Sequence, residues 1–576
     1  MPLDLLRTYL RPRWREASLL AALLFGGVGL QLLGPQVLRA FVDRAQAGEA
    51  VEALAATAAL FLGLTIATQA VTVAESYLAE NLGWTTTNAL RADLVRHCLA
   101  LDLGFHAART PGELIERIDG DVTAIANFFS RFVLRVLANA LLLLGVLALL
   151  LREDLWIGLA LAAFAALAGL VISRRGRFVT PRWTAARQSS ADLIGFLEER
   201  LAGLVDLKAN GATGYVMRRL HQRQRERFLT ARGAMVVGSA FYAAVTLVFT
   251  AGYAVALGLG AWRYAAGAMT LGAVYLVFQY TQMLRQPLEQ INRQIQDLQR
   301  AAASVARVRE LLGTPLAVPD GPGAPLPPGP LGVELDGVSF AYGEGPAVLR
   351  AVRLRVEPGQ VLGLVGRTGA GKSTVARLVA RLYDPTAGAV RLGGVDLRSL
   401  RLDQLRARVG LVTQDVQLFQ GSVRDNLTLF DRTVSEARLT ELLEQIGLGD
   451  WLAALPGGLE AELGAGGAGL SAGQAQLLAL GRLLLRDPGL IVLDEASSRL
   501  DPASERLVER ALARLLEGRS AIVIAHRLST LDRADAVALL EDGRVVEQGP
   551  RAALAADRGS RFAALLRAGG LPEALA

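Results

Sequence analysis

The chain is poor in the residues that build disulfides, metal sites and ordinary charged surfaces. Its 576 residues include one cysteine (Cys98), four histidines and only two lysines, Lys208 and Lys372. A single cysteine excludes an internal disulfide and any cysteine-based metal site. Charged residues make up 20% of the chain and hydrophobic residues 52%, with a mean hydropathy of +0.34. This composition is not that of an ordinary soluble protein.

The apolar residues gather in the first half, in runs of the roughly 20 residues needed to cross a bilayer. The arginines flank these runs, which is typical of membrane topology and argues against nucleic acid as a partner. Two long, arginine-rich connections (76–130 and 175–235) are expected to continue the helices into the cytoplasm, where both termini should also lie. No cleavage pattern precedes the first run, which predicts an uncleaved span. The predicted spans are residues 17–41, 52–75, 131–152, 155–174, 236–260 and 266–288.

Several polar side chains fall within or near these spans. Polar groups at membrane depth usually face a partner helix or a cavity. One interpretation is hydrogen bonding between helices or snorkelling to the interface. The other places Arg135 and Asn139 in a substrate cavity that accepts a polar or negative head group. The set is Gln31, Gln69, Arg135, Asn139, Gln279, Tyr280 and Gln282.

Seven prolines between Gly313 and Gly332 separate the apolar half from the rest. Such a stretch forms neither helix nor strand and indicates a linker. Beyond it, strand and helix patterns alternate, as in an α/β domain. The predicted organisation is an all-α six-helix transmembrane domain over residues 1–312, a linker over 313–332 and an α/β P-loop domain over 333–576.

A phosphate-binding motif, GxxxxGK[ST], opens this second half. It spans Gly366-Arg367-Thr368-Gly369-Ala370-Gly371-Lys372-Ser373, between a strand pattern at 361–365 and a helix pattern at 374–382. The chain carries 61 lysines and arginines, yet keeps a compact ammonium here, which a forked guanidinium does not easily replace against phosphates. Ser373 is placed to bind Mg²⁺. The motif predicts ATP or GTP binding.

Further candidate residues follow at ordered spacings. The apolar strand pattern 490–493 ends in Asp494 and Glu495, which suit a Mg²⁺ shell and the activation of a water molecule. Leu470-Ser471-Ala472-Gly473-Gln474 begins the preceding helix and offers backbone donors to phosphate. His526 ends another apolar strand. Each is common alone, and their order together is informative.

Together these residues resemble the ATP-binding cassette (ABC) transporters of the exporter type, over nearly the whole chain. By this resemblance Tyr342 stacks on adenine, Gly366 to Thr374 form Walker A, and Ser471, Ala472, Gly473 and Gln474 form the signature loop. Gln414 is the Q-loop glutamine that touches Mg²⁺, and Asp494 is the Walker B aspartate. Glu495 is the general base, Asp501 lies in the D-loop, and His526 is the switch histidine. The implied cofactors are ATP and Mg²⁺.

The resemblance also implies a half-transporter. The family's signature loop serves ATP bound to the other ATPase domain, and this chain has one copy of each motif. Two chains would therefore dimerise in the cell membrane, with both ATPase domains cytoplasmic. Turns that couple the two halves are expected near Thr110–Ile115 and Ala209–Tyr215.

Three departures from the family pattern lie around the signature. Ala472 stands at a glycine position, Ala465 stands at a glutamate position, and Ala475-Gln476-Leu477 replaces Arg-Gln-Arg. Altered signatures with intact Walker B and histidine are similar to one half of heterodimeric multidrug exporters. This favours a heterodimer and leaves a homodimer open.

The implied activity is ATP hydrolysis coupled to export of a hydrophobic or amphipathic solute, such as a drug, lipid or peptide, by alternating access. One alternative is an exporter-like machine for a dedicated cargo. Another is a regulatory, weakly transporting subunit of a heterodimer, although such a subunit needs neither Glu495 nor His526. The six predicted spans exclude a soluble cassette ATPase acting on DNA or ribosomes.

Overall fold

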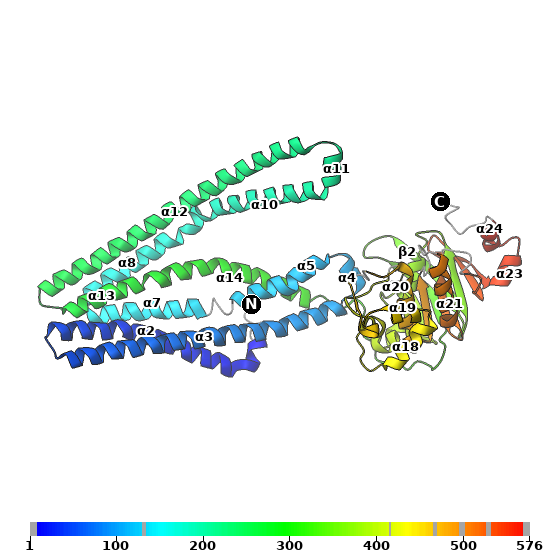
Figure 1. Ribbon diagram of the computed structural model, residues 1–576, viewed down its shortest axis with the longest axis horizontal. Coiled ribbons are helices and arrows are strands. Elements are labelled where there is room, and N and C mark those ends of the chain that lie inside the picture. Colours follow the sequence, from blue (N-terminus) through cyan, green and yellow to red (C-terminus); the bar gives the residue numbers. More distant parts are fainter. Residues whose placement is uncertain are drawn as a thin grey trace. The chain divides into compact units, whose positions relative to one another are not determined.

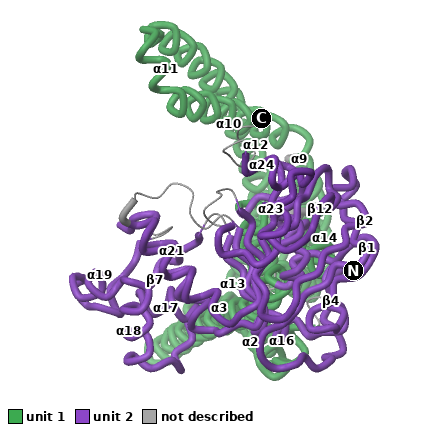
Figure 2. The backbone as a smooth tube through the Cα atoms, turned by 90° about the vertical axis from the view of Figure 1, so that its right-hand side faces the viewer, with its two compact units in different colours: residues 1–99, 112–314 green, residues 100–111, 315–576 purple. Residues whose placement is uncertain are grey.

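A computed structural model describes residues 8–128, 134–413, 416–464, 469–494, 502–525 and 531–567. The chain divides into two compact units. Unit 1 holds residues 1–99 and 112–314, and unit 2 holds residues 100–111 and 315–576 (Figure 2). A short segment of the first half, 100–111, therefore packs with the second half.

Unit 1 is helical throughout its described residues (Figure 1). Its two longest helices, α3 and α12, run far beyond the roughly 30 Å of a bilayer core. The elements are η1 (Arg11–Arg13), α2 (Trp14–Gln46), α3 (Val51–Ala100), α5 (Pro111–Ile115), a π-helix η2 (Glu116–Asp121), α6 (Val122–Asn127), α7 (Leu134–Glu153), α8 (Leu155–Ser173), α9 (Arg175–Phe178), α10 (Thr180–Ala202), α11 (Leu204–Ala209), α12 (Thr213–Ala265), α13 (Leu271–Met283) and α14 (Arg285–Leu312).

Five helical segments among the described residues are long and apolar enough to cross a membrane: Thr8–Gln46, Val51–Ala100, Val136–Glu153, Leu155–Ala202 and Thr213–Ala265. They coincide with the first five predicted spans. The sixth run falls on α13, which has 13 residues and leads into the polar helix α14. Side chains of α13 such as Leu276, Val277 and Tyr280 are fully buried in the helical bundle.

Hydrogen bonds between helices account for two of the polar residues in the predicted spans. The Asn139 amide donates to Gln290 Oε1 at 2.9 Å, which joins α7 to α14. The Tyr280 hydroxyl donates to Leu32 O and accepts from Gln36 Nε2, both at 2.9 Å, which joins α13 to α2. The interhelical interpretation is confirmed for Asn139 and Tyr280. The side chain of Arg135 lies outside the described residues.

Unit 2 is built on a six-stranded sheet of order β12-β11-β3-β10-β9-β6, parallel except for β12. A four-stranded antiparallel sheet, β2-β1-β4-β5, shares a hydrophobic core with it. A second core lies among the helices α17 to α21. The alternation of strands and helices predicted for this half is confirmed.

The strands are β1 (Val333–Ala341), β2 (Ala347–Val356), β3 (Val361–Gly366), β4 (Ala387–Leu392), β5 (Val395–Asp396), β6 (Val409–Val412), β7 (Gly421–Ser422), β8 (Glu462–Leu463), β9 (Leu490–Asp494), β10 (Ser520–Ile524), β11 (Ala536–Glu541) and β12 (Arg544–Pro550). The helices are α4 (Leu103–Ala107), α15 (Lys372–Val379), η4 (Leu397–Ser399), α16 (Leu402–Arg408), α17 (Val423–Thr428), α18 (Glu436–Gln445), α19 (Gly449–Ala454), η5 (Gly458–Glu460), α20 (Ala472–Arg486), α21 (Pro502–Leu516), α23 (Arg551–Ala556) and α24 (Arg561–Arg567).

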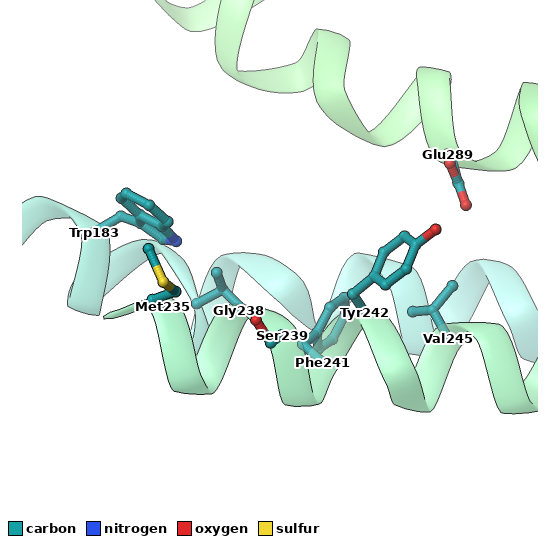
Figure 3. Close-up of a pocket in the computed structure, with 9 residues that line it drawn as sticks. Trp183, Met235, Gly238, Ser239, Phe241, Tyr242, Val245 and Glu289 are labelled. Atoms are coloured by element: carbon teal, nitrogen blue, oxygen red, sulfur yellow. The ribbon is translucent and has the colours of Figure 1, made fainter. Parts of the chain in front are cut away.

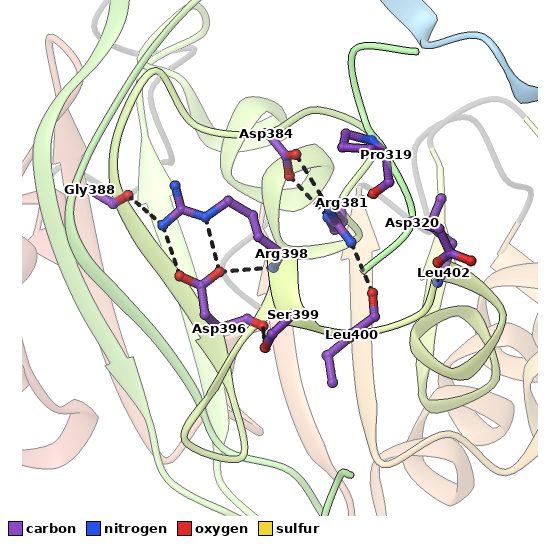
Figure 4. A network of polar contacts seen from close by, with 10 residues as sticks. All are labelled: Pro319, Asp320, Arg381, Asp384, Gly388, Asp396, Arg398, Ser399, Leu400 and Leu402. Carbon is purple, nitrogen blue, oxygen red and sulfur yellow. Dashed lines mark hydrogen bonds and ion pairs between the residues drawn. The ribbon is translucent and has the colours of Figure 1, made fainter. Parts of the chain in front are cut away.

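The proline-rich stretch contains no helix or strand, but it is fastened to unit 2 (Figure 4). The guanidinium of Arg381, whose side chain is 1% exposed, donates to the carbonyl oxygen of Pro319 at 2.9 Å and to Asp384 at 3.0 Å. The backbone nitrogen of Gly321 donates to Leu400 O at 3.1 Å. From Pro319 onward the stretch is thus bound to the rest of unit 2.

Candidate ATP site

The phosphate loop lies where the sequence places it, between the buried strand β3 and helix α15. Gly371 precedes the helix at φ +106°, a conformation that glycine adopts without strain. A Cβ at Gly366 would lie 2.2 Å from Leu540 O. The loop therefore needs glycine at both positions for its own shape, apart from any ligand.

The side chain of Lys372 hydrogen-bonds to the backbone of this loop. Its side chain is buried, and Nζ donates to Gly366 O at 2.7 Å and to Arg367 O at 3.0 Å. Ser373 and Thr374 follow in the first turn of α15, whose amides and dipole favour an anion. The tip of the loop, Arg367 to Gly369, is exposed.

Tyr342, the predicted adenine partner, follows strand β1 and is tied to α15. Its hydroxyl lies 3.0 Å from Thr374 Oγ1 and accepts from Arg377 Nη1 at 3.0 Å. Its ring contacts Phe340 and Tyr383 edge to face, with centroids 4.8 and 5.3 Å apart. These contacts fix the plane of the ring beside the phosphate loop.

The sheet order gathers the other strand-end residues on the same edge. β10 pairs in parallel with β3 on one side and β9 on the other, with Ile524 opposite both Leu364 and Asp494. Asp494 thus ends β9, which is separated from the phosphate-loop strand β3 by β10 alone. It lies at the carboxyl edge of the sheet, where α/β sheets bind ligands. Gln414, Glu495, Asp501 and His526 lie outside the described residues.

The signature turn is an ordered helix start. Ser471 caps α20: its Oγ accepts from Gln474 N at 3.2 Å, and its own N–H donates to Gln474 Oε1 at 2.9 Å. This reciprocal pair is a capping box. Ser471 and Ala472 are exposed. Ala472 is a first-turn helical residue without positive φ, so alanine is unstrained here.

Gly473 allows close packing between two helices. A Cβ there would lie 2.5 Å from the Cβ of Ser504 on α21. The glycine lets helices α20 and α21 approach each other, a packing role that the motif does not reveal. Leu477, which stands in place of a family arginine, is 1% exposed and belongs to the helical core.

Two family models match the chain. The ABC transporter model matches residues 349–498, and the ABC transporter transmembrane region model matches residues 18–288. A fatty acid ABC transporter ATP-binding/permease protein of Mycobacterium bovis is 30% identical over 503 residues, 87% of this chain and 80% of that protein. The chain belongs to the ABC transporter family. The transporter is a half-transporter of the exporter type, an ATPase whose transmembrane and ATP-binding regions share one chain.

Two further relatives match 97% and 82% of the transporter. An ATP-dependent lipid A-core flippase of Thiobacillus denitrificans is 28% identical and spans 97% of this chain and 96% of its own. A multidrug efflux ATP-binding/permease protein of Mycobacterium bovis is 32% identical over 82% of the chain and 39% of that protein. Among solved structures, a bacterial Atm1-family ABC exporter with ATP bound matches with a TM-score of 0.79 and 25% identity, covering 97% and 98% of the two chains.

Proposed function

We propose that the transporter exports an amphipathic solute through the cell membrane, as one half of a dimer that closes on ATP. The observation that carries this is the pairing of a complete phosphate loop with an exposed, capped signature turn on one chain. Lys372 is buried in the loop, whereas Ser471 and Ala472 face outward. An exposed phosphate-binding turn is suited to ATP held by another chain.

Within the site we assign ATP to the loop from Gly366 to Thr374, with Tyr342 against adenine. Ser373 and Asp494 supply hydroxyl and carboxylate oxygens, the ligands that Mg²⁺ prefers. Both are half-buried at the sheet edge described above, and we propose them, with Gln414, as the residues that hold the ion. When bound, Mg²⁺ offsets negative charge on the phosphates. We assign Glu495 as the general base and His526 as the switch histidine.

The second half of each site is proposed to come from another half-transporter. The changes at Ala465, Ala472 and Leu477 favour a partner of different sequence, because they alter the signature side and leave the Walker residues in place. The described geometry supports a functional turn despite Ala472, since Ser471 and Gln474 cap the helix. A dedicated cargo or a regulatory subunit remains the second candidate.

A cavity of about 520 Å³ in unit 1 fits an amphipathic cargo (Figure 3). Its lining comes from α10, α12 and α14, and volumes of this size suit small ligands. Apolar and aromatic side chains form most of the wall, and Glu289 is the acidic group, paired with Arg285 at 3.0 Å. The lining residues are Val179, Trp183, Met235, Gly238, Ser239, Phe241, Tyr242, Val245 and Glu289.

This cavity lies at the cytoplasmic ends proposed for two spans: Val179 and Trp183 follow the span 155–174, and Gly238 to Val245 fall within the first ten residues of the span 236–260. Trp183 and Tyr242 are the aromatic types that lie at membrane–water interfaces. We propose that cargo enters from the inner leaflet, with its apolar part against Trp183 and Met235 and its polar head near the Arg285–Glu289 pair.

ATP turnover by this chain purified alone in lipid, beside Glu495→Gln, tests the proposal. We expect ATP binding with negligible hydrolysis until a partner half-transporter is added. Robust hydrolysis by the chain alone, abolished by Glu495→Gln, would show a homodimer with two equivalent sites. Absence of ATP binding by folded protein would contradict the proposed function itself.

A further inference from the structure

The turn after the phosphate-loop helix contacts two segments that lead to the membrane domain. Arg381, at φ +48°, holds the proline-rich stretch through Pro319 O and is itself locked by Asp384 and Leu400 O. Figure 4 shows these contacts of Arg381. Two residues later, Tyr383 lies beside the segment 100–111, which directly follows the membrane helix α3.

Tyr383 lies beside that segment, within ordinary van der Waals reach of one carbon added at Gly104. A Cβ at Gly104, in α4, would lie 3.7 Å from Cε1 of Tyr383. Burial, followed by Tyr342, raises the pKa of the Tyr383 phenol; Arg377 acts against this shift, and the carboxylate of Asp102 adds to it. Asp102 caps α4 by accepting from Phe105 N at 3.1 Å. The ring of Tyr383 is therefore half-buried between α4 and the nucleotide side of the sheet.

On its other side Tyr383 packs edge to face against Tyr342, with centroids 5.3 Å apart at 87°. Phe340 completes a triangle of rings, 5.4 Å from Tyr383 and 4.8 Å from Tyr342. Because Arg381 is buried and bonded in three directions, the backbone that carries Tyr383 is held in place. The rings of Tyr383 and Tyr342 therefore form a row of contacts that begins beside α4.

We propose that Tyr383 is a positioning residue that links α4 to the adenine-binding ring of Tyr342, so that movement of the membrane helix α3 changes the affinity for the base. The proposal rests on the adenine role assigned to Tyr342 under the proposed function. It deepens that function by naming a route for regulation of the same site.

Equilibrium binding of ATP and of inorganic tripolyphosphate to the full chain in lipid nanodiscs tests this route. Tripolyphosphate has no base, so it reports the phosphate loop alone. Tyr383→Ala is expected to weaken ATP binding about 3- to 10-fold, the range that aromatic pairs contribute, and to leave tripolyphosphate binding unchanged. Tyr383→Phe keeps the ring and should bind ATP as the natural chain does.

Two variants at Gly104 test the α4 end. Gly104→Ala disturbs the Asp102 cap but makes only ordinary contact with Tyr383, so it is the control. Gly104→Val has the same effect on the cap and also presses on the ring, and should weaken ATP binding a further 2- to 5-fold. In a Tyr383→Ala background, this further loss should vanish.

The possible failures are distinguishable. If Tyr342→Ala leaves ATP binding unchanged, the adenine role is wrong and the linkage falls with it. If Tyr342→Ala weakens ATP binding and Tyr383→Ala does not, the linkage alone is overturned. Equal losses for ATP and tripolyphosphate would also overturn it, because they would show that Tyr383 only supports the fold of the loop.

Discussion

The ATPase unit contains two helix starts assigned to phosphate, and they differ in how much of their surroundings the chain supplies. The start of α15 is enclosed: Lys372 and Thr374 are each 6% exposed, and the lysine bonds to carbonyls of its own loop. The start of α20 is capped by Ser471 and Gln474 but lies open. Both are ordered, so exposure of the second does not reflect poor folding.

The difference supports the two halves of an ATP site that we propose for these helix starts. An enclosed loop holds its shape before any ligand or partner arrives. An exposed, capped turn keeps its shape through the reciprocal Ser471–Gln474 hydrogen bonds, and its outer face is open to a phosphate from a partner chain. Four substitutions test the difference between the enclosed start of α15 and the exposed start of α20. Their expected effects decrease from the first substitution to the last.

The largest effect is expected from Lys372→Ala. The ammonium makes charge-assisted bonds to phosphate of about 1.5–3 kcal/mol, so ATP affinity should fall roughly 10- to 100-fold. Equilibrium ATP binding measures this. Lys208→Ala, at the only other lysine and exposed on α11, is the matched control and should bind normally. Equal losses in both variants would refute a specific role for Lys372.

Ser471→Asp should separate binding from hydrolysis. Aspartate preserves a good helix cap but puts a negative charge at the turn assigned to a partner's phosphates, which costs several kcal/mol. ATP binding by the single chain should stay within about twofold, while hydrolysis by the purified dimer falls on the order of 100-fold. Ser435→Asp, at the cap of α18, controls for the charge. Weakened ATP binding in the single chain would mean that the turn serves its own site.

Gly473→Ala should affect stability. The added Cβ would lie 2.5 Å from Ser504 Cβ, and overpacking of this kind costs about 1–3 kcal/mol. We expect thermal unfolding of the ATPase unit to shift down by roughly 2–8 °C. Gly195→Ala in α10, where a Cβ meets nothing within 4 Å, should not lower the midpoint. A Gly473→Ala protein as stable as the natural chain would show that α21 can move away freely.

The smallest effect is expected from Ala472→Gly, which restores the family residue. The position is exposed and helical, so the free energy of unfolding should change by less than about 1 kcal/mol. One methyl group is worth about 0.8 kcal/mol of contact, so hydrolysis by the dimer should change no more than about fourfold. A much larger gain would show that Ala472 obstructs the partner's nucleotide.

The phosphate loop was predictable because its signal is local: a strand, a fixed glycine spacing and a helix within 20 or so residues. The same holds for five spans, whose apolar runs are long. The sixth was harder, because α13 is short and its burial depends on neighbouring helices.

The contacts between these motifs and residues distant in the sequence were not predictable. The role of Gly473 depends on Ser504, and that of Tyr383 on α4, and single sequences do not show such distant pairs. The coupling turn predicted near Thr110–Ile115 overlaps the unit 2 segment 100–111 at Thr110 and Pro111, and the sequence does not predict the short helix of that segment, α4 at Leu103–Ala107. Five residues carry no periodic signal, and only the capping residue Asp102 marked its start.

The scarcity of lysine has a practical consequence for following the transport cycle. Apart from the α-amine of Met1, the chain offers amine-reactive reagents two targets, and Lys372 is buried in the phosphate loop. Lys208 is exposed on α11, between the long helices α10 and α12. Once the α-amine is blocked, a fluorescent dye could therefore be attached at the tip of the α10–α12 hairpin of the unmutated protein, to report its movement as ATP binds.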